Sequence, residues 1–304
     1  MTNGDSAKPR VLILGGLGML GHKLCQILSP KMDVWTTVRR DADLLRSTEI
    51  LDADRVLDGV DARKPDTMLR ALDMVEPDAV VNCIGIVKQL PEARDPVVAI
   101  EINSLFPHRM AKLCAERSVY LIHISTDCVF SGVRGMYVED DPSDAQDLYG
   151  RSKALGEIMG SNCLTLRTSI IGRELRGRRG LIEWFMAQKG KTVRGYTQAV
   201  FSGITSQAFA KIIGRLVQRE QRLEGLYQIA AHPICKYDLL NLVKRAYSLD
   251  VSIEPFAGVV VDRSLDGTLF RTETGLAAGD WESMVGELAD DPFDYDNWRQ
   301  AHAA

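Results

Sequence analysis

Three residues in the middle of the chain have the types and spacing needed to help reduce a carbonyl group. Tyr149 and Lys153 are four residues apart, so they share one face if this segment is helical. A ketone oxygen gains negative charge as a hydride reaches its carbon, and a proton donor and a second hydrogen bond both lower that barrier. Tyr149 suits the first role and Thr126 the second. A Lys153 ammonium nearby would favour the phenolate and lower the Tyr149 pKa.

A glycine-rich segment near the N-terminus has the pattern of a dinucleotide-binding turn. Residues 15–21 read Gly-Gly-Leu-Gly-Met-Leu-Gly, between a predicted strand and an amphipathic stretch over 19–28. Glycines permit the tight turn and the close approach of backbone to a pyrophosphate, whose charge then lies at a helix N-terminus. The alternative is a turn that binds nothing. We expect a dinucleotide to bind at Gly15, Gly18, Met19, Leu20 and Gly21.

The residues after the second predicted strand favour NADPH, with NADH possible. An acidic residue that holds the ribose 2′-hydroxyl of NAD is expected about 20 residues into such a unit. The chain instead has Arg39 and Arg40, whose guanidinium groups would form charge-assisted hydrogen bonds with the 2′-phosphate of NADP. Alternatively, both are solvated and have Asp41 or Asp43 as partners. Lys153 would hold the nicotinamide ribose.

Short apolar strands that alternate with helical patterns must position these residues. Continuous apolar strands covered on both faces are typical of parallel sheets, and the alternation is typical of βαβ units. We therefore predict an α/β fold with a doubly wound parallel Rossmann sheet. Its strands are expected at Arg10–Leu14, Val34–Val38, Arg55–Leu57, Ala79–Asn82, Val119–Ser125 and Cys163–Arg167.

The alternation stops in a segment rich in arginine and glycine, residues 172–180. We predict a Rossmann domain over 1–170. Residues 171–304 are expected to form mainly a smaller α/β substrate lobe, with some segments returning to the Rossmann domain. This part contains predicted helices at Ser206–Arg219 and Lys236–Tyr247, a predicted strand at Leu226–Ile229, and an acidic tail with tryptophans.

Composition argues against several kinds of partner. The chain has 304 residues, is 45% hydrophobic and 26% charged, and carries a formal charge of −4, so it suits a globular protein and not a nucleic-acid binder. Neither a membrane-spanning stretch nor an apolar signal region is expected. The six cysteines include no Cys-x-x-Cys pair, which predicts reduced thiols in the cytoplasm. The histidines lack metal-ligand spacing, so no metal is expected.

Taken together, these motifs resemble the extended short-chain dehydrogenases/reductases, and within them the dTDP-4-dehydrorhamnose reductase-like group. The resemblance covers nearly the whole chain and implies NADPH-dependent reduction of the 4-keto group of a nucleotide-activated 6-deoxy sugar. It rests on residues 15–21, 80–83, 125–130, 149–153, 166–169 and 270–276.

The resemblance also assigns roles to residues that the spacing alone leaves open. It implies that Asp61 and Ala62 contact adenine and that Asn103 supports the helix bearing Tyr149. Relatives often pair through the helices of Asn103 and Tyr149, so a homodimer is possible. Lining of the cofactor cleft is implied for Cys83, Ile84 and Gly85.

Some segments depart from the group's pattern and leave the substrate less well defined than the chemistry. Arg263 lacks the proline that usually follows it, and the segment 173–179 has no clear counterpart. Its arginines, Arg173 among them, would clamp a substrate diphosphate or would simply be solvated.

The residue at position 128 bears on the alternative activities. Cys128 stands where dehydratases of this fold carry glutamate, and no histidine lies between Tyr149 and Ala231 to assist an epimerisation. We expect Cys128 to form part of the substrate pocket wall. The alternatives are an epimerase/reductase or dehydratase of the same fold, or a non-catalytic NADP-binding regulatory subunit.

Overall fold

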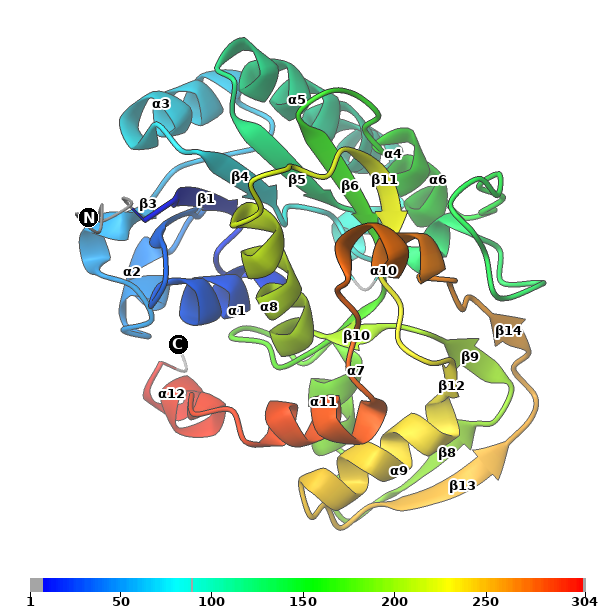
Figure 1. Ribbon diagram of the computed structural model, residues 1–304. Helices are drawn as coiled ribbons and strands as arrows, with labels where there is room; N and C mark the ends of the chain where they lie inside the picture. Colours follow the sequence, from blue (N-terminus) through cyan, green and yellow to red (C-terminus); the bar gives the residue numbers. More distant parts are fainter. Residues whose placement is uncertain (1–7, 89, 303–304) are drawn as a thin grey trace, which may run out of the picture.

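A seven-stranded parallel sheet forms the centre of the molecule in the computed structural model, which describes residues 8–88 and 90–302 (Figure 1). The strand order is β11-β6-β5-β4-β1-β2-β3, and every pair in it is parallel. This confirms the doubly wound α/β fold. Chain order reverses between β1 and β4, where such sheets bind ligands. The strands are β1 Arg10–Leu14, β2 Asp33–Thr37, β3 Val56–Leu57, β4 Ala79–Asn82, β5 Tyr120–Ile124, β6 Cys163–Arg167 and β11 Gly225–Gln228.

Alternate side chains of the strands build two separate cores. Val11 and Ile13 of β1 pack on one face of the sheet, and Leu12 and Leu14 pack on the other. Figure 1 shows α1 beside α8 over one face, with α3 and α5 over the opposite face. Both faces are covered, which explains the continuous apolar strands. The four helices are α1 Met19–Leu28, α8 Ser206–Val217, α3 Pro65–Val75 and α5 Phe106–Glu116.

The predicted strands and helices are all present, with their ends either unchanged or displaced by one or two residues. The strand predicted at Leu226–Ile229 is β11, and it pairs with β6 in the central sheet. Helix α8, from the same part of the chain, packs against α1. The Rossmann sheet therefore takes a strand and a covering helix from beyond residue 170.

Short helices connect the strands on the side where Tyr149 lies. A π-helical segment, η3 (Ile100–Leu105), joins α4 (Pro96–Ala99) to α5 and packs against α6 (Leu148–Leu155). The turn after β5 is η4 (Asp127–Val129), which also packs against α6. The other short helices are α2 Ala42–Arg46, η1 Ala53–Arg55 and η2 Pro91–Arg94.

The remaining segments form small sheets and helices beyond one end of the central sheet (Figure 1). Strand β9 (Ala199–Phe201) lies between β12 (Ile234–Cys235) and β14 (Val261–Asp262), and β8 (Thr192–Tyr196) pairs with β13 (Ser252–Phe256). The other elements here are β7 Ile170–Ile171, β10 Ile204–Thr205, α7 Leu181–Met186, α9 Lys236–Ala246, α10 Thr268–Thr274 and α11 Trp281–Ala289. No helix of the described residues is long and apolar enough to cross a bilayer.

The end of the chain returns to the first helix. The last helix, α12 (Tyr295–Ala301), brings the Tyr295 hydroxyl to within 2.9 Å of His22 Nε2 on α1. Asp291, just before it, forms a buried ion pair with Lys23 of the same helix. Burial lowers the pKa of His22 to about 4, so the ring is neutral at pH 7 and packs against the tail without charge.

Candidate active site

The glycine loop between β1 and α1 has room for backbone only. Gly15 has a φ of +91°, and the amides of Gly15 and Gly16 donate to the Thr37 carbonyl at 3.2 and 3.0 Å. A Cβ on Gly21 would lie 2.1 Å from the Gly15 oxygen, and one on Gly16 would lie 2.4 Å from Thr36 Oγ1. Each of these glycines is therefore required by a tight turn or a close approach.

The N-terminus of α1 is left free to receive an anion. Gly18 precedes the helix, no side chain caps it, and its first turn contains no acidic residue. The opening N–H groups of a helix have no partner within the helix, and its dipole favours negative charge there. Met19 and Leu20 supply two of these groups. The loop therefore fits the pyrophosphate of a dinucleotide.

Arg39 and Arg40 are exposed, and neither forms an ion pair or a side-chain hydrogen bond with the described part of the chain. Their suggested partners are engaged elsewhere, since Asp41 pairs with Arg176 at 2.8 Å and Asp43 pairs with Arg46 at 2.9 Å. Neither Asp41 nor Asp43 pairs with Arg39 or Arg40 in the structure, and both arginines are exposed to solvent. Two guanidinium groups beyond the end of β2 remain available for a phosphate.

Asp61 is buried, and Arg63 occupies its carboxylate. The Arg63 guanidinium donates to both carboxylate oxygens, at 3.2 and 2.9 Å. These hydrogen bonds lower the pKa of Asp61 to about 2, and the charge of Arg39 contributes in the same direction. A contact between Asp61 and adenine would have to share this carboxylate with Arg63, whereas the neighbouring Ala62 carries no such constraint.

The loop of Cys83, Ile84 and Gly85 lies between the glycine loop and Asn103. The Cys83 amide donates to the Leu14 carbonyl at 3.1 Å, which fixes the loop beside the end of β1. The side chain of Asn103 accepts from the amide of Ile86 at 2.8 Å. The three residues thus lie beside the glycine loop, as lining of a cofactor cleft requires.

Helix α6 is held by hydrogen bonds at both its start and its middle. Asp147 caps it by accepting from the Gly150 amide at 2.7 Å. The Asn103 amide donates to Ser152 Oγ at 3.2 Å, and Ser104 Oγ donates to the Ser152 carbonyl at 2.7 Å. The supporting role expected for Asn103 is confirmed.

A close approach at Gly150 brings α6 against the turn after β5. A Cβ at this position would lie 2.1 Å from the Cys128 carbonyl oxygen, so only glycine permits this contact. Thr126 is buried at the start of the same turn, where its hydroxyl accepts from the Cys128 amide at 3.1 Å. The structure therefore brings Tyr149 and Thr126 together, and Thr126 acts to lower the Tyr149 pKa.

Lys153 is a buried cation on the same helix as Tyr149. Its ammonium donates to the Ile124 carbonyl at 2.7 Å, and burial lowers its pKa to about 8. Burial raises the pKa of Tyr149, and this effect outweighs the lowering by Thr126. The Tyr149 pKa is therefore raised in the structure, whereas the sequence led us to expect that Lys153 lowers it. Tyr149 is protonated at neutral pH, which is the form that a proton donor needs.

A family model described as the RmlD substrate binding domain matches residues 9–232. The chain belongs to this family.

Two of the relatives carry names that refer to sugar-ketone reduction. The dTDP-4-dehydrorhamnose reductase of Burkholderia thailandensis is 27% identical over 187 residues, covering 60% of this chain and 52% of the relative. The probable dTDP-4,6-dihydroxy-2-methyloxan-3-one 4-ketoreductase of Streptomyces antibioticus is 32% identical over 173 residues, covering 56% and 53%. Another relative, the mouse methionine adenosyltransferase 2 subunit beta, is 29% identical over 152 residues, covering 49% and 41%. The matches span about half the length of these relatives.

Solved structures share the fold over almost the whole chain. The dTDP-4-dehydrorhamnose reductase of Bacillus anthracis in complex with NADP has a TM-score of 0.77 at 19% identity, covering 94% of this chain and all of that one. The Bordetella bronchiseptica enzyme WbmG in complex with NAD and UDP has a TM-score of 0.76 at 19% identity, covering 99% and 97%.

Arg173 of this RmlD family member is occupied by protein groups. Its buried guanidinium donates to Glu183 at 2.6 Å and to Asp296 at 3.4 Å, and Arg299 shares Glu183 with it. The neighbouring Arg176 reaches Asp41 beside the free arginines after β2. A substrate diphosphate would have to displace these carboxylates, so the geometry weighs against the expected clamp.

Cys128 is half-buried beside Thr126, and its thiol is neutral at physiological pH. Burial and the charge of Asp127 raise its pKa to about 11, which suits a pocket-wall residue better than a base. Within residues 8–88 and 90–302, no group of three or more His, Cys, Asp or Glu residues could hold a metal ion.

Lys236 is a partly buried cation near Asp127 that the sequence pattern did not reveal. It is the first residue of α9, more than 80 residues beyond Lys153, and its charge acts on the buried carboxyl of Asp127. One local signal was available. A cation in the first turn of a helix opposes the helix dipole, and such a placement suggests a purpose other than helix stability.

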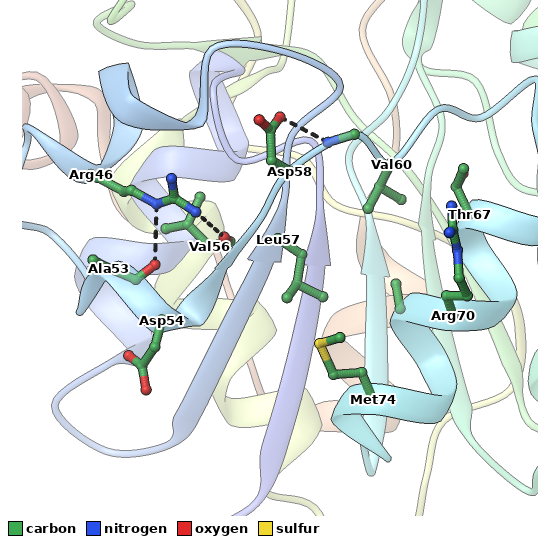
Figure 2. A pocket seen from close by; sticks show the side chains of 12 residues that line it. Arg46, Ala53, Asp54, Val56, Leu57, Asp58, Val60, Thr67, Arg70 and Met74 are labelled. Atoms are coloured by element: carbon green, nitrogen blue, oxygen red, sulfur yellow. Dashed lines mark hydrogen bonds between the residues drawn. The ribbon is translucent and has the colours of Figure 1, made fainter.

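A separate cavity of about 510 Å³ lies between the edge strand β3 and helix α3 (Figure 2). Leu57, Val60 and Met74 line it, and Arg46 at its rim donates to the carbonyls of Ala53 and Val56. None of the predicted catalytic residues lines this cavity.

Proposed function

We propose that this chain is an NADPH-dependent reductase of the 4-keto group of a nucleotide-activated 6-deoxy sugar. The observation that carries the proposal is the approach of α6 to the turn after β5, which brings the hydroxyls of Tyr149 and Thr126 together. The glycine loop, at the carboxyl end of β1, adds a dinucleotide site at the same edge of the sheet, with β4 between β1 and β5. Family membership and the names of two relatives support the same reaction class.

The cofactor's phosphates have two sets of donors in this proposal. The free N–H groups at Met19 and Leu20 hold the pyrophosphate, and Arg39 and Arg40 hold the 2′-phosphate. Lys153 binds the nicotinamide ribose. When bound, NADPH supplies the hydride. NADH, which lacks the 2′-phosphate, would bind more weakly through the same loop.

Tyr149 and Thr126 act on the carbonyl oxygen in this proposal. Tyr149 donates its phenolic proton to the oxygen as negative charge develops there, and burial keeps it protonated until that point. Thr126 turns its hydroxyl from Asp127, to which it donates at 3.1 Å, toward the same oxygen. The sum of the reaction is ketone, NADPH and one proton giving alcohol and NADP⁺.

The substrate lies between the turn after β5 and the lobe built mainly from residues 171–304 in this proposal. Cys128 forms part of the pocket wall and does not remove a proton, so reduction proceeds without epimerisation and without dehydration. We leave Arg173 out of the substrate contacts because Glu183 and Asp296 already bind it.

We further propose that the chain forms a homodimer in the cytoplasm. Large apolar side chains are exposed on α4, η3 and α6, with Val97 70% and Leu155 66% exposed, and burying them against a second copy would stabilise the pair. The six free cysteines are consistent with a reducing compartment. Light scattering should give twice the chain mass, and Leu155→Glu should give the monomer.

The test of the reaction is a screen of dTDP-, UDP- and GDP-linked 4-keto-6-deoxy sugars, with NADPH oxidation as the readout. We expect oxidation with at least one of them and a 4-hydroxyl product. A second candidate function is a non-catalytic regulatory subunit, favoured by the mouse relative named above. Tight NADPH binding without turnover of any of the ketosugars would favour that candidate and overturn the reductase proposal.

A further inference from the structure

Lys236 lies where the C-terminal lobe meets the turn after β5. It follows β12, which pairs with β9 through Ile234 and Phe201, and its ammonium is 3.3 Å from the centroid of the Phe201 ring. Strand β14 pairs with the other side of β9. Arg263, directly after β14, donates to the carbonyl of Phe130 at 2.9 Å. These contacts tie the strand under Lys236 to the turn that carries Thr126.

The ammonium of Lys236 has no hydrogen bond or ion pair with any residue that the structure describes, although the side chain is partly buried. Other enclosed lysines have partners, since Lys23 pairs with Asp291 and Lys153 donates to Ile124. Burial lowers the pKa of Lys236 to about 8, which reflects the cost of removing a charge from water. The position at the start of α9 adds the unfavourable helix dipole.

Asp127 and Lys236 are close enough for each charge to act on the pKa of the other group. The Asp127 carboxyl is buried and accepts from Thr126 at 3.1 Å, and Lys236 contributes the largest opposing effect to the burial that raises its pKa. The two charged groups are more than 4 Å apart, because they form no ion pair. The other cations near this turn already have acceptors, since Arg263 binds Phe130 and Lys88 binds Asp147 at 2.6 Å.

We propose that Lys236 binds the sugar ring of the substrate by donating a hydrogen bond to the hydroxyl on the carbon next to the ketone, while Asp127 accepts a hydrogen bond from that hydroxyl. This inference rests on the proposed reduction. The ketone oxygen is placed at Thr126 and Tyr149, so the group beside it lies next to Asp127. A hydroxyl satisfies a donor and an acceptor together. A phosphate would be repelled by Asp127, and an apolar group would leave both charges without partners.

The test compares binding of the nucleotide with binding of the sugar nucleotide. Isothermal titration would use dTDP and dTDP-rhamnose, or the UDP or GDP equivalents if the ketosugar screen selects those. Lys236→Met keeps the length of the side chain and removes the charge. The matched control is Lys191→Met, an exposed lysine of the same lobe with no ion pair among the described residues.

We expect Lys236→Met to weaken dTDP-rhamnose roughly 10- to 100-fold and to leave dTDP unchanged, because a charge-assisted hydrogen bond to the sugar is lost. Lys191→Met should change neither. In turnover, Lys236→Met should raise KM for the natural ketosugar. A 3-deoxy ketosugar lacks the hydroxyl that Lys236 binds, so its KM should be the same in Lys236→Met and in the unmodified enzyme.

Three outcomes would overturn the proposal. The first is unchanged dTDP-rhamnose affinity in Lys236→Met. The second is equal weakening of dTDP and dTDP-rhamnose, which would place Lys236 at the diphosphate. The third is a rise in KM for the 3-deoxy ketosugar in Lys236→Met as large as the rise for the natural ketosugar. Thermal unfolding distinguishes a folding defect from a loss of sugar binding, because removing a partly buried charge without a partner should leave Tm unchanged or raise it. If the unmodified chain turns over no ketosugar, the proposed function itself fails.

Discussion

The Rossmann side and the C-terminal side of the candidate site differ in how their polar groups are satisfied. On the Rossmann side, backbone groups and short hydrogen bonds do most of the positioning, as with the Gly15 turn and the Asp147 cap of α6. On the side of the C-terminal lobe, a side-chain cation, Lys236, stands near the site without a partner. Backbone groups held by hydrogen bonds suit a cofactor that is the same in every catalytic cycle. A cation without a partner suits selection among substrates, because the right ligand supplies the missing acceptor.

This difference predicts that variants on the Rossmann side stop the chemistry or change cofactor binding, whereas variants of Lys236 change sugar affinity.

Tyr149→Phe should have the largest effect. Only the hydroxyl that donates to the carbonyl oxygen is lost, so turnover should fall by roughly 100- to 10,000-fold with NADPH affinity little changed. Stopped-flow oxidation of NADPH and fluorescence titration would measure the two quantities. Tyr196→Phe, at a half-exposed tyrosine of β8, is the control and should retain full activity. Near-normal turnover in the Tyr149 variant would remove the proton-donor assignment.

Gly150→Ala should follow, through displacement of α6. Its Cβ would lie 2.1 Å from the Cys128 oxygen, so the helix must move away and carry Tyr149 from Thr126. A shift of about 1 Å at such a site costs on the order of 100-fold in rate. Gly160→Ala is the control, because a Cβ there meets open space. A fully active Gly150→Ala would show that the close approach of α6 is dispensable.

Arg39→Ala should change the choice of cofactor. The 2′-phosphate is the group that distinguishes NADPH from NADH, and losing one charge-assisted contact costs about 1.5–3 kcal/mol, or roughly 10- to 150-fold in affinity. We expect that loss for NADPH and little change for NADH. Arg46→Ala, whose guanidinium is bound by Asp43 and backbone carbonyls, is the control. Equal weakening of both cofactors would give Arg39 a structural role.

The pH dependence of binding should give the smallest effect. It should distinguish the role of Lys153 in NADPH binding from that of Lys236 in binding the sugar nucleotide. Burial lowers the pKa of Lys153 to about 8 and that of Lys236 to about 8, so each is charged below that pH and loses its proton as pH rises through it. NADPH affinity should therefore decline above pH 8, by about tenfold at pH 9 if the ammonium is required. Lys236→Met should leave the NADPH profile as it is and flatten the profile for the sugar nucleotide. A changed NADPH profile in that variant would contradict the separation.

The sequence predicted the Rossmann side well because its signals are local. The seven-residue glycine loop, the strand ends and the four-residue spacing of Tyr149 and Lys153 each lie within a single strand-to-helix unit. The expectation for Arg39 and Arg40 depended on neighbours only one to four residues away, and it stays a prediction, with Asp41 and Asp43 paired to other arginines.

Contacts between segments that are distant in the sequence could not be predicted from such local patterns. Arg173 was expected to meet a diphosphate, but α12 brings Asp296 to it from more than 120 residues away. Lys236 approaches Asp127 only because β12 pairs with β9. The pKa of Tyr149 also depends on burial, which residue spacing does not report.

Isotope transfer tests the central claim most directly. The ketosugar selected by the screen would be reduced in ordinary water with NADPH that carries deuterium at the transferring position, and the product would be examined by NMR. The account predicts one deuterium at C4 and none elsewhere, and a parallel reaction in deuterated water with unlabelled NADPH should leave no carbon-bound deuterium at C3 or C5. Transfer of no deuterium to C4, or solvent deuterium at C3 or C5, would contradict reduction without epimerisation.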